Sequence, residues 1–330
     1  ALSFIGGFFC CVIYMVAFSL SLSGAFAQKN KGIKVAIDLK DVKDDKVLVT
    51  ITPPAFESES TTFFIPKIVP GTYSEDNYGK YIENFKAFDK KGKELTVTKA
   101  DVNSWKIADE KKLSNITYLV NDTYDIEATH EIFSPSGTNI LANENFVINT
   151  HGFIGYFDGE DELPYEVSIT HPAELWASTS LVDTHAGNDI DVFSSPRYAD
   201  LVDHPIMYSK PDYTTFTVDG MDILISVYSP NGVIKAKDLT PEMETMMRAQ
   251  KKFLGPINST KKYSVLIYLS DGSQIDAQGY GALEHTTSTT VVMPEAYPLE
   301  QLLSSMKDIV SHEFFHIVTP LSVHSKEIHN

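Results

Sequence analysis

Near the end of the 330-residue chain, His312, Glu313 and His316 form the pattern His-Glu-Phe-Phe-His. On an α-helix, side chains four residues apart lie on the same side one turn away, so both imidazoles would reach one Zn²⁺ ion. Glu313 follows the first histidine directly and would lean over the open position of that ion. There it would act as general base toward a water molecule that the metal acidifies. The pattern therefore predicts zinc-dependent hydrolysis.

This motif rarely occurs by chance in a chain of this length. With the His and Glu content of the chain, it would arise by chance in 330 residues with odds of roughly 2%. The competing interpretation is a pair of surface histidines on an ordinary amphipathic helix. Phe314, Phe315 and Ile317 argue against it, because they would bury this turn on more than one side. Buried His and Glu side chains need partners, and a metal ion supplies one.

A second candidate segment, Gly279–Thr289, lies about thirty residues upstream of the motif. Its glycines would let a backbone approach a ligand closely. An edge strand beside a zinc site would be able to pair with an extended peptide. The carboxylate of Glu284 would then bind the α-ammonium group of a substrate, a charge that aminopeptidases need and endopeptidases do not. Considered without its surroundings, Glu284 is an ordinary loop carboxylate.

Alternating apolar residues predict β-strands in the first half of the chain. The alternation recurs within residues 34–176, for example at Val47 and Val49. Turns rich in Pro and Gly separate the runs, and no convincing amphipathic helix appears between them. We therefore predict an antiparallel β-sandwich-like domain over residues 28–210, with Thr184–Pro196 as a polar connection.

Residues 211–330 combine strand and helix patterns, so the predicted fold class of the chain is mixed α+β. Strands are expected at 214–218, 223–228 and 263–269. Thr240 would cap a helix that has Pro241 at its first position and stops at Gly255, and Pro298 would open a second that ends at Pro320. The side chains expected in the core are those of Met243, Met246, Met247, Phe253, Leu254, Leu302, Met306, Ile309, Val310 and Phe314.

Taken together, Gly281-Ala-Leu-Glu-His285 and His312-Glu-Phe-Phe-His316 resemble the glycyl aminopeptidase family of gluzincin metallopeptidases. The resemblance covers most of the chain after Gln28. Weaker similarities to the N-terminal region of that family lie at Pro70-Gly-Thr-Tyr73, Trp105 and Asp200-Leu-Val-Asp-His-Pro205.

The resemblance implies a β domain, a thermolysin-like catalytic domain and commonly a C-terminal PDZ domain. It implies that His312 and His316 bind Zn²⁺ and that Glu313 is the general base. Gly281 and Glu284 match the motif that holds the amino end of the substrate in related aminopeptidases. The expected substrate-binding residues are Gly281, Ala282, Glu284 and His285.

The third zinc ligand of that family is a glutamate on a later helix, which is expected beyond residue 330. Glu327 is a poor substitute, since it follows Pro320 and lacks a helical setting. We therefore expect residues 211–330 to be the first part of a zincin domain, and the 330-residue chain by itself to be inactive. The residues after the motif, Ile317–His324, depart from the family pattern and leave the substrate preference open.

The start of the chain predicts export. Residues 2–22 carry no charge, and Ala25-Phe26-Ala27 reads as a signal-peptidase site, so residues 1–27 are expected to be a signal peptide. An uncleaved membrane anchor is the alternative. Both cysteines lie in this segment, so the mature chain has no disulfide and is expected to be periplasmic, in the cell envelope or secreted. The net charge of −17 excludes nucleic acid as an expected partner.

Three functions remain open from the sequence. The leading one is a zinc aminopeptidase acting on peptides, the second is an endopeptidase with the same metal chemistry, and the third is a non-catalytic peptide-binding envelope protein. An intact Glu313 disfavours the third, because a scaffold does not need a general base. The sequence leaves the oligomeric state and the physiological role open.

Overall fold

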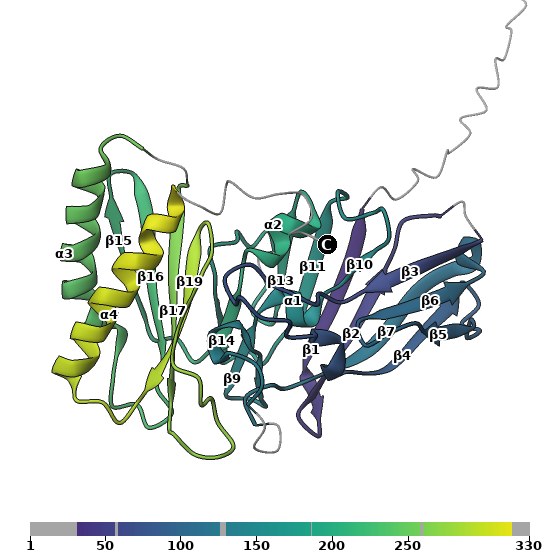
Figure 1. Ribbon diagram of the computed structural model, residues 1–330, viewed down its shortest axis with the longest axis horizontal. Coiled ribbons are helices and arrows are strands. Elements are labelled where there is room, and N and C mark those ends of the chain that lie inside the picture. Colours follow the sequence, from purple (N-terminus) through teal and green to yellow (C-terminus); the bar gives the residue numbers. More distant parts are fainter. Residues whose placement is uncertain (1–31, 57–58, 126–129, 186, 258–259, 319–330) are drawn as a thin grey trace, which may run out of the picture.

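The computed structural model describes residues 32–56, 59–125, 130–185, 187–257 and 260–318 (Figure 1). The predicted signal peptide, Pro320 and Glu327 lie outside the described residues. In the described part, no helix combines the length and the apolar character that crossing a membrane requires.

The first part of the chain is built around a six-stranded sheet. Buried positions alternate with more exposed ones along β2 (Lys46–Thr52), for example, where Val47 and Val49 are fully buried. All neighbouring strands run antiparallel except β1 and β11, which pair in parallel. From one edge to the other, the strands are β13 (Ile190–Ser195), β11 (Tyr165–Thr170), β1 (Ile33–Lys43), β2 (Lys46–Thr52), β7 (Leu113–Asn121) and β4 (Ile82–Asp89).

Two four-stranded sheets complete this β domain. One consists of β10 (Tyr156–Phe157), β3 (Ser60–Phe64), β6 (Ser104–Ala108) and β5 (Val97–Lys99), and the other of β12 (Trp176–Ser178), β14 (Ile206–Ser209), β9 (Asn145–Ile148) and β8 (Asn139–Leu141). Short helical turns join them: η1 (Tyr78–Tyr81), η2 (Glu110–Lys112), η3 (Ser134–Ser136), α1 (Thr150–Phe153) and α2 (Tyr198–Val202). A single hydrophobic core connects the sheets.

The predicted β-sandwich-like character is confirmed, with two corrections. The sandwich is not wholly antiparallel, because β1 and β11 run side by side in the same direction. The stretch Thr184–Pro196 is not only a connection, since it contains β13 at the edge of the large sheet. The polar residues there are compatible with a strand because an edge strand has a neighbour on one side only.

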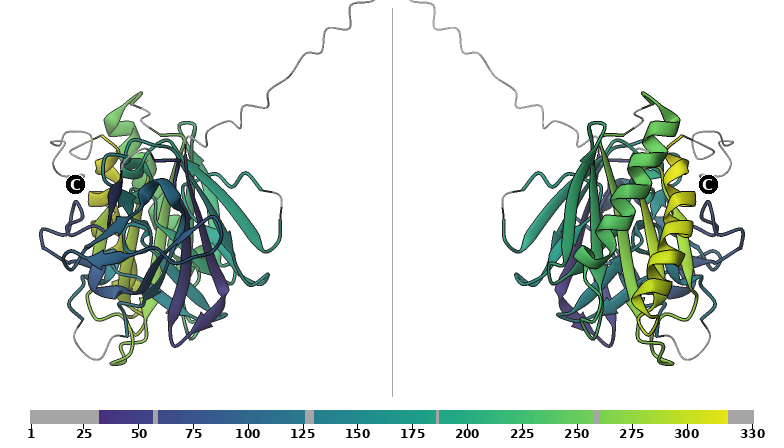
Figure 2. Two further views of the ribbon diagram at one scale, coloured as in Figure 1. Left: turned by 90° about the vertical axis from the view of Figure 1, so that its right-hand side faces the viewer. Right: turned by 90° about the vertical axis from the view of Figure 1, so that its left-hand side faces the viewer.

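The last part of the chain forms a five-stranded sheet with two helices, α3 (Ala236–Leu254) and α4 (Leu299–Phe314), on one face. Figure 2 shows the two helices side by side on that face. The three central strands are parallel and the two edge strands antiparallel. In order across the sheet they are β15 (Tyr213–Val218), β16 (Met221–Tyr228), β17 (Lys262–Ser270), β19 (Ser288–Pro294) and β18 (Gly281–Glu284).

The opposite face of this sheet rests on the β domain. Leu266 and Val292 form one cluster with Val147 and Met207 of the β domain, and Tyr268 packs edge-on against Tyr124. Strands that are buried on both faces often read as apolar runs, as much of β17 does. Strand β19 is buried at every position although it begins with Ser-Thr-Thr. The domain boundary that we expect near Pro211 falls between β14 and β15.

Both helices differ in their limits from the sequence prediction. Helix α3 begins at Ala236 rather than near Thr240, so Pro241 lies inside it. The earlier start is stabilised by Asp238, which accepts the amide N–H of Lys235 at 2.9 Å, and by Asp212, which accepts that of Ala236 at 3.0 Å. These bonds satisfy amide groups that a helix leaves unpaired at its start.

Helix α4 begins after Pro298 as predicted but ends at Phe314, and a 3₁₀ turn, η4 (Phe315–Ile317), follows it. A tightened last turn of this kind is common at helix ends. The methionines of α3 are in the core as expected, but Phe253 is 81% exposed and does not belong to it.

The turn that carries the motif should depend strongly on one aromatic side chain. Phe314 is fully buried, and its ring meets that of Tyr263 edge-on at 5.0 Å between centroids. We expect Phe314→Ala to lower the free energy of unfolding by about 3–5 kcal/mol, because it leaves a cavity between α4 and β17. The exposed Phe253→Ala is the control and should change it by less than about 0.5 kcal/mol. Urea unfolding measures both, and similar losses would contradict the packing of Phe314 against β17.

Candidate metal centre

The end of α4 brings the three residues of the motif together. His312 and Glu313 lie in its last turn, and His316 lies in the 3₁₀ turn that follows. One ligand atom from each of the three falls within 4.8 Å of the others, and the two imidazole centroids are 5.3 Å apart. The change from α to 3₁₀ geometry thus preserves the proximity that the sequence spacing predicts.

Glu313 is the most buried of the three residues of the motif. Glu313 is 7% exposed, whereas His312 is open to solvent and His316 is half-buried. The Glu313 Oε2 atom lies 3.9 Å from His316 Nε2 and accepts no hydrogen bond from the described residues. Burial first, and then the nearby charge of Glu284, raise the pKa of Glu313 to about 7.

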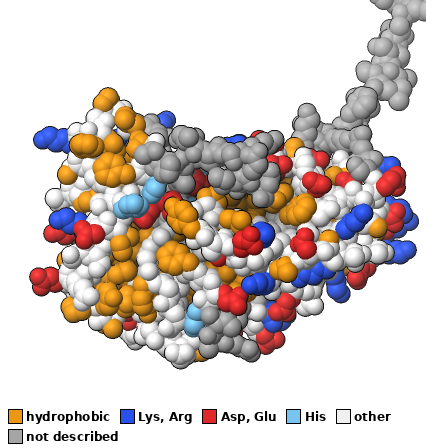
Figure 3. Space-filling view, in the orientation of Figure 1, with side chains coloured by type: hydrophobic (Ala, Val, Ile, Leu, Met, Phe, Trp, Pro, Cys, Tyr) orange, Lys and Arg blue, Asp and Glu red, His pale blue; other side chains and the backbone are white. Residues whose placement is uncertain are grey.

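These residues fit a zinc ion. The two imidazoles are donors that Zn²⁺ accepts, and their ligand atoms lie within 4.8 Å of each other and of a carboxylate oxygen of Glu313, which would lie beside the ion. A cation there would also compensate the buried Oε2 atom of Glu313, which accepts no hydrogen bond from the described residues. Two surface histidines on an ordinary helix would not have such a buried carboxylate beside them. Figure 3 shows histidine and acidic side chains close together on the face that α4 presents.

Strand β18 divides the predicted substrate-binding residues between the two faces of the sheet. In its antiparallel pairing, Ala282 lies opposite Val291 and Glu284 opposite Thr289. Val291 belongs to the core beneath the helices, so Ala282 and Glu284 point toward α4. The influence of Glu284 on the pKa of Glu313 agrees with this placement.

Gly281 of β18 lies on the other face of the sheet, and His285, the first residue after the strand, contacts the β domain. The ring of His285 is buried, with Nδ1 3.5 Å from Oδ1 of Asp203. Burial works to raise the pKa of Asp203, but His285 holds it below its usual value. Asp203 also accepts the amide N–H of Thr286 at 3.1 Å. His285 therefore contacts the β domain through Asp203, and its predicted role in substrate binding stays a prediction.

The outer edge of β18 is a candidate surface for pairing with a peptide. The amide N–H of His285 donates to the carbonyl of Ser288 across the hairpin. Because main-chain groups alternate along an antiparallel strand, those of Leu283 also point toward β19, and those of Ala282 and Glu284 point away from it. The strand thus directs main-chain donors and acceptors outward beside the carboxylate of Glu284.

Sequence reasoning missed one residue beside this carboxylate, Gly71. It lies in the stretch Pro70–Tyr73 with φ of 93°, a conformation that side chains disfavour. A Cβ atom placed on Gly71 would be 2.6 Å from Cδ and Oε2 of Glu284. A turn signal and a weak family similarity mark this stretch in the sequence, but neither indicates contact with a residue more than two hundred positions away.

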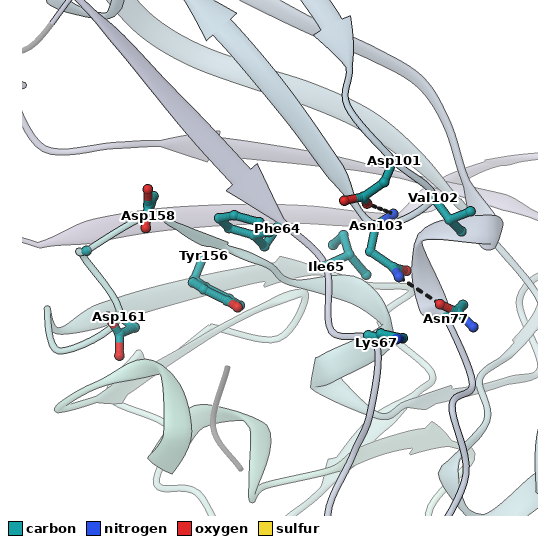
Figure 4. Close-up of a pocket in the computed structure, with 11 residues that line it drawn as sticks. Phe64, Ile65, Lys67, Asn77, Asp101, Val102, Asn103, Tyr156, Asp158 and Asp161 are labelled. Carbon is teal, nitrogen blue, oxygen red and sulfur yellow. Dashed lines mark hydrogen bonds between the residues drawn. The ribbon is translucent and has the colours of Figure 1, made fainter. Parts of the chain in front are cut away.

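A hollow of about 730 Å³ lies elsewhere, in the β domain (Figure 4). The rings of Phe64 and Tyr156 are stacked on its wall at 5.4 Å, and Asp158 and Asp161 lie near them. On the other side, Asn103 donates to Asn77. Its lining residues include none of His312, Glu313 and His316 and no residue of β18.

The comparisons with known proteins agree with this architecture. Residues 34–210 match the family described as Peptidase M61 N-terminal domain. An aminopeptidase N family protein from Idiomarina loihiensis has a similar structure, with a TM-score of 0.72 and 18% identity over 86% of this chain and 47% of that one. This chain therefore spans about half the length of that protein.

A second solved structure is more distant. A mutant M1 zinc metallopeptidase from Deinococcus radiodurans, bound to a Tyr-Ser-Ala substrate, gives a TM-score of 0.45 and 12% identity over 78% of this chain and 59% of that one. No curated protein matches the chain in sequence.

Proposed function

The chain belongs to the peptidase M61 family, and from this premise we propose that the full-length protein is a zinc-dependent aminopeptidase. His312 and His316 would hold the metal, and Glu313 would be the general base. The observation that carries the aminopeptidase assignment is the placement of Glu284. Its carboxylate lies on an edge strand, faces α4 and acts on the pKa of the buried Glu313.

Zinc, when bound, acidifies a water molecule and polarises the carbonyl of the bond to be cut. The protein residues supply the proton transfers. Glu313 is buried beside the two histidines, so its carboxylate would take a proton from the attacking water. The same carboxylate then gives that proton to the leaving amine, which completes the cleavage of the peptide bond.

Substrate position would be set by β18. An extended peptide that pairs with the outward main-chain groups of Ala282 and Glu284 gains hydrogen bonds without a requirement for particular side chains. The Glu284 carboxylate would bind the α-ammonium group of that peptide through a charge-assisted hydrogen bond. The free amino end is thereby held at a fixed distance from the metal-binding residues, so that the first peptide bond is the one cut.

Replacement of Glu284 tests this assignment. In the zinc-loaded full-length protein, Glu284→Ala should lower kcat/KM for peptides with a free amino end by about 100-fold, the loss expected for a desolvated charge pair of about 3 kcal/mol. N-acetylated peptides lack the ammonium group, so their slow hydrolysis should change by less than about threefold. Equal losses on both peptides would refute the aminopeptidase assignment and favour the endopeptidase alternative.

A further inference from the structure

A turn of the β domain contacts the residue that would bind the amino end of the substrate. We infer that the Pro70–Tyr73 turn is the outer wall of the subsite for the α-ammonium group and that Gly71 is a positioning residue for Glu284. This inference rests on the proposed aminopeptidase function and deepens it. The substrate subsite would then be assembled from both domains, with the carboxylate supplied by β18 and the wall by the β domain.

The contact leaves no room for a side chain. A Cβ atom on Gly71 would meet the carboxylate carbon of Glu284 at 2.6 Å and its two oxygens at 2.6 and 2.7 Å. Such distances lie far inside van der Waals contact, so the backbone of Gly71 must lie directly against the carboxylate. A ligand of Glu284 is therefore excluded from that side and has to approach from the side of α4.

The turn is fixed firmly enough to act as a wall. At its base, the amide N–H groups of Asn77 and Tyr78 donate to the carbonyls of Lys67 and Pro66 at 3.0 and 3.2 Å. Within the turn, the Thr72 hydroxyl donates to the carbonyl of Val69 at 2.9 Å. Val69 itself is buried in the core of the β domain. A loop that is closed by hydrogen bonds and anchored by an apolar side chain holds its tip in one place.

Gly71 would also be needed for its backbone conformation alone, and a control separates the two roles. Gly92 has a φ of 76°, close to the 93° of Gly71, and a Cβ atom there would have no neighbour within 4 Å. Gly92→Ala therefore introduces the same kind of backbone strain without touching the site. Any effect of Gly71→Ala beyond that of Gly92→Ala comes from the contact with Glu284.

The test is a double-mutant cycle on the zinc-loaded full-length protein. Gly71→Ala should lower kcat/KM for free-amine peptides at least tenfold, chiefly through KM, whereas Gly92→Ala should stay within twofold. In the Glu284→Ala background, Gly71→Ala should have almost no further effect, because the group that it displaces is gone. Thermal unfolding of both glycine variants shows whether each is folded.

Two results would overturn the inference, and they differ. If Gly71→Ala matches Gly92→Ala, or if it lowers activity equally with and without Glu284, the turn has no role in positioning the carboxylate, and the aminopeptidase assignment stands. If the wild type cleaves acetylated and free-amine peptides equally well, the proposed aminopeptidase function is refuted. The inference that the Pro70–Tyr73 turn bounds an α-ammonium subsite is then refuted as well.

Discussion

Glu313→Gln is expected to lower kcat by about 10³-fold or more while the protein keeps its zinc. General-base catalysis contributes about 10²–10⁴-fold to a rate, and the amide of glutamine has no basic site for the proton. We propose this role because the Glu313 carboxylate is buried beside the two histidines and its Oε2 atom accepts no hydrogen bond from the described residues. Measurement of kcat and of the metal content of the same preparation tests the prediction.

The matched control for this variant is Glu300→Gln. Glu300 lies on the same helix but in its exposed first turn. It should leave kcat within about twofold, in line with the small effects of surface substitutions. A Glu313→Gln protein with full zinc and substantial activity would exclude Glu313 as the base. Such a result would leave the metal-binding histidines in place but require a different proton acceptor.

The second large effect is expected from His316→Ala. Mutation of residues that only support a metal ligand lowers metal affinity by about 10–100-fold. Removal of one of the two imidazoles themselves should therefore weaken zinc binding by more than that. Activity in the full-length protein should fall with the zinc content, and both should be measured after dialysis against a weak chelator. His185→Ala, an exposed histidine of the β domain, is the control and should keep the wild-type zinc content. Unchanged zinc binding in His316→Ala would contradict the site.

Local patterns in the sequence predicted most of the elements. The alternation of apolar residues led to β1, β2 and β11, and the Pro and Gly signals marked the end of α3 and the start of α4. Local signals failed where a neighbour in space decides the outcome. Strand β13 lies at a sheet edge, where its polar residues are tolerated, and α3 begins early because Asp212, from a separate loop, accepts an amide N–H of its first turn.

The proximity of His312, Glu313 and His316 was predictable from their spacing, but the contacts that other segments make around the candidate site were not. Residues four apart meet on a helix or a tight turn whatever the rest of the chain does. The contact between Gly71 and Glu284, and that between Asp203 and His285, join segments of two domains that are remote in sequence. A pattern confined to one segment carries no information on such contacts. Once the pairing of β18 with β19 is known, the faces on which its side chains lie follow from the alternation of side chains along a strand.

The sheet of the last domain has one consequence for how this protein could change in evolution. Helices α3 and α4 cover one face, and the other face is covered by Tyr124, Val147 and Met207 of the β domain. If recombination attached a different β domain, that domain would need a matching apolar surface from the start. Otherwise the apolar face of the sheet would be exposed to water. The junction between the two halves is thus a poor place for module exchange, and the halves are expected to be inherited as a pair.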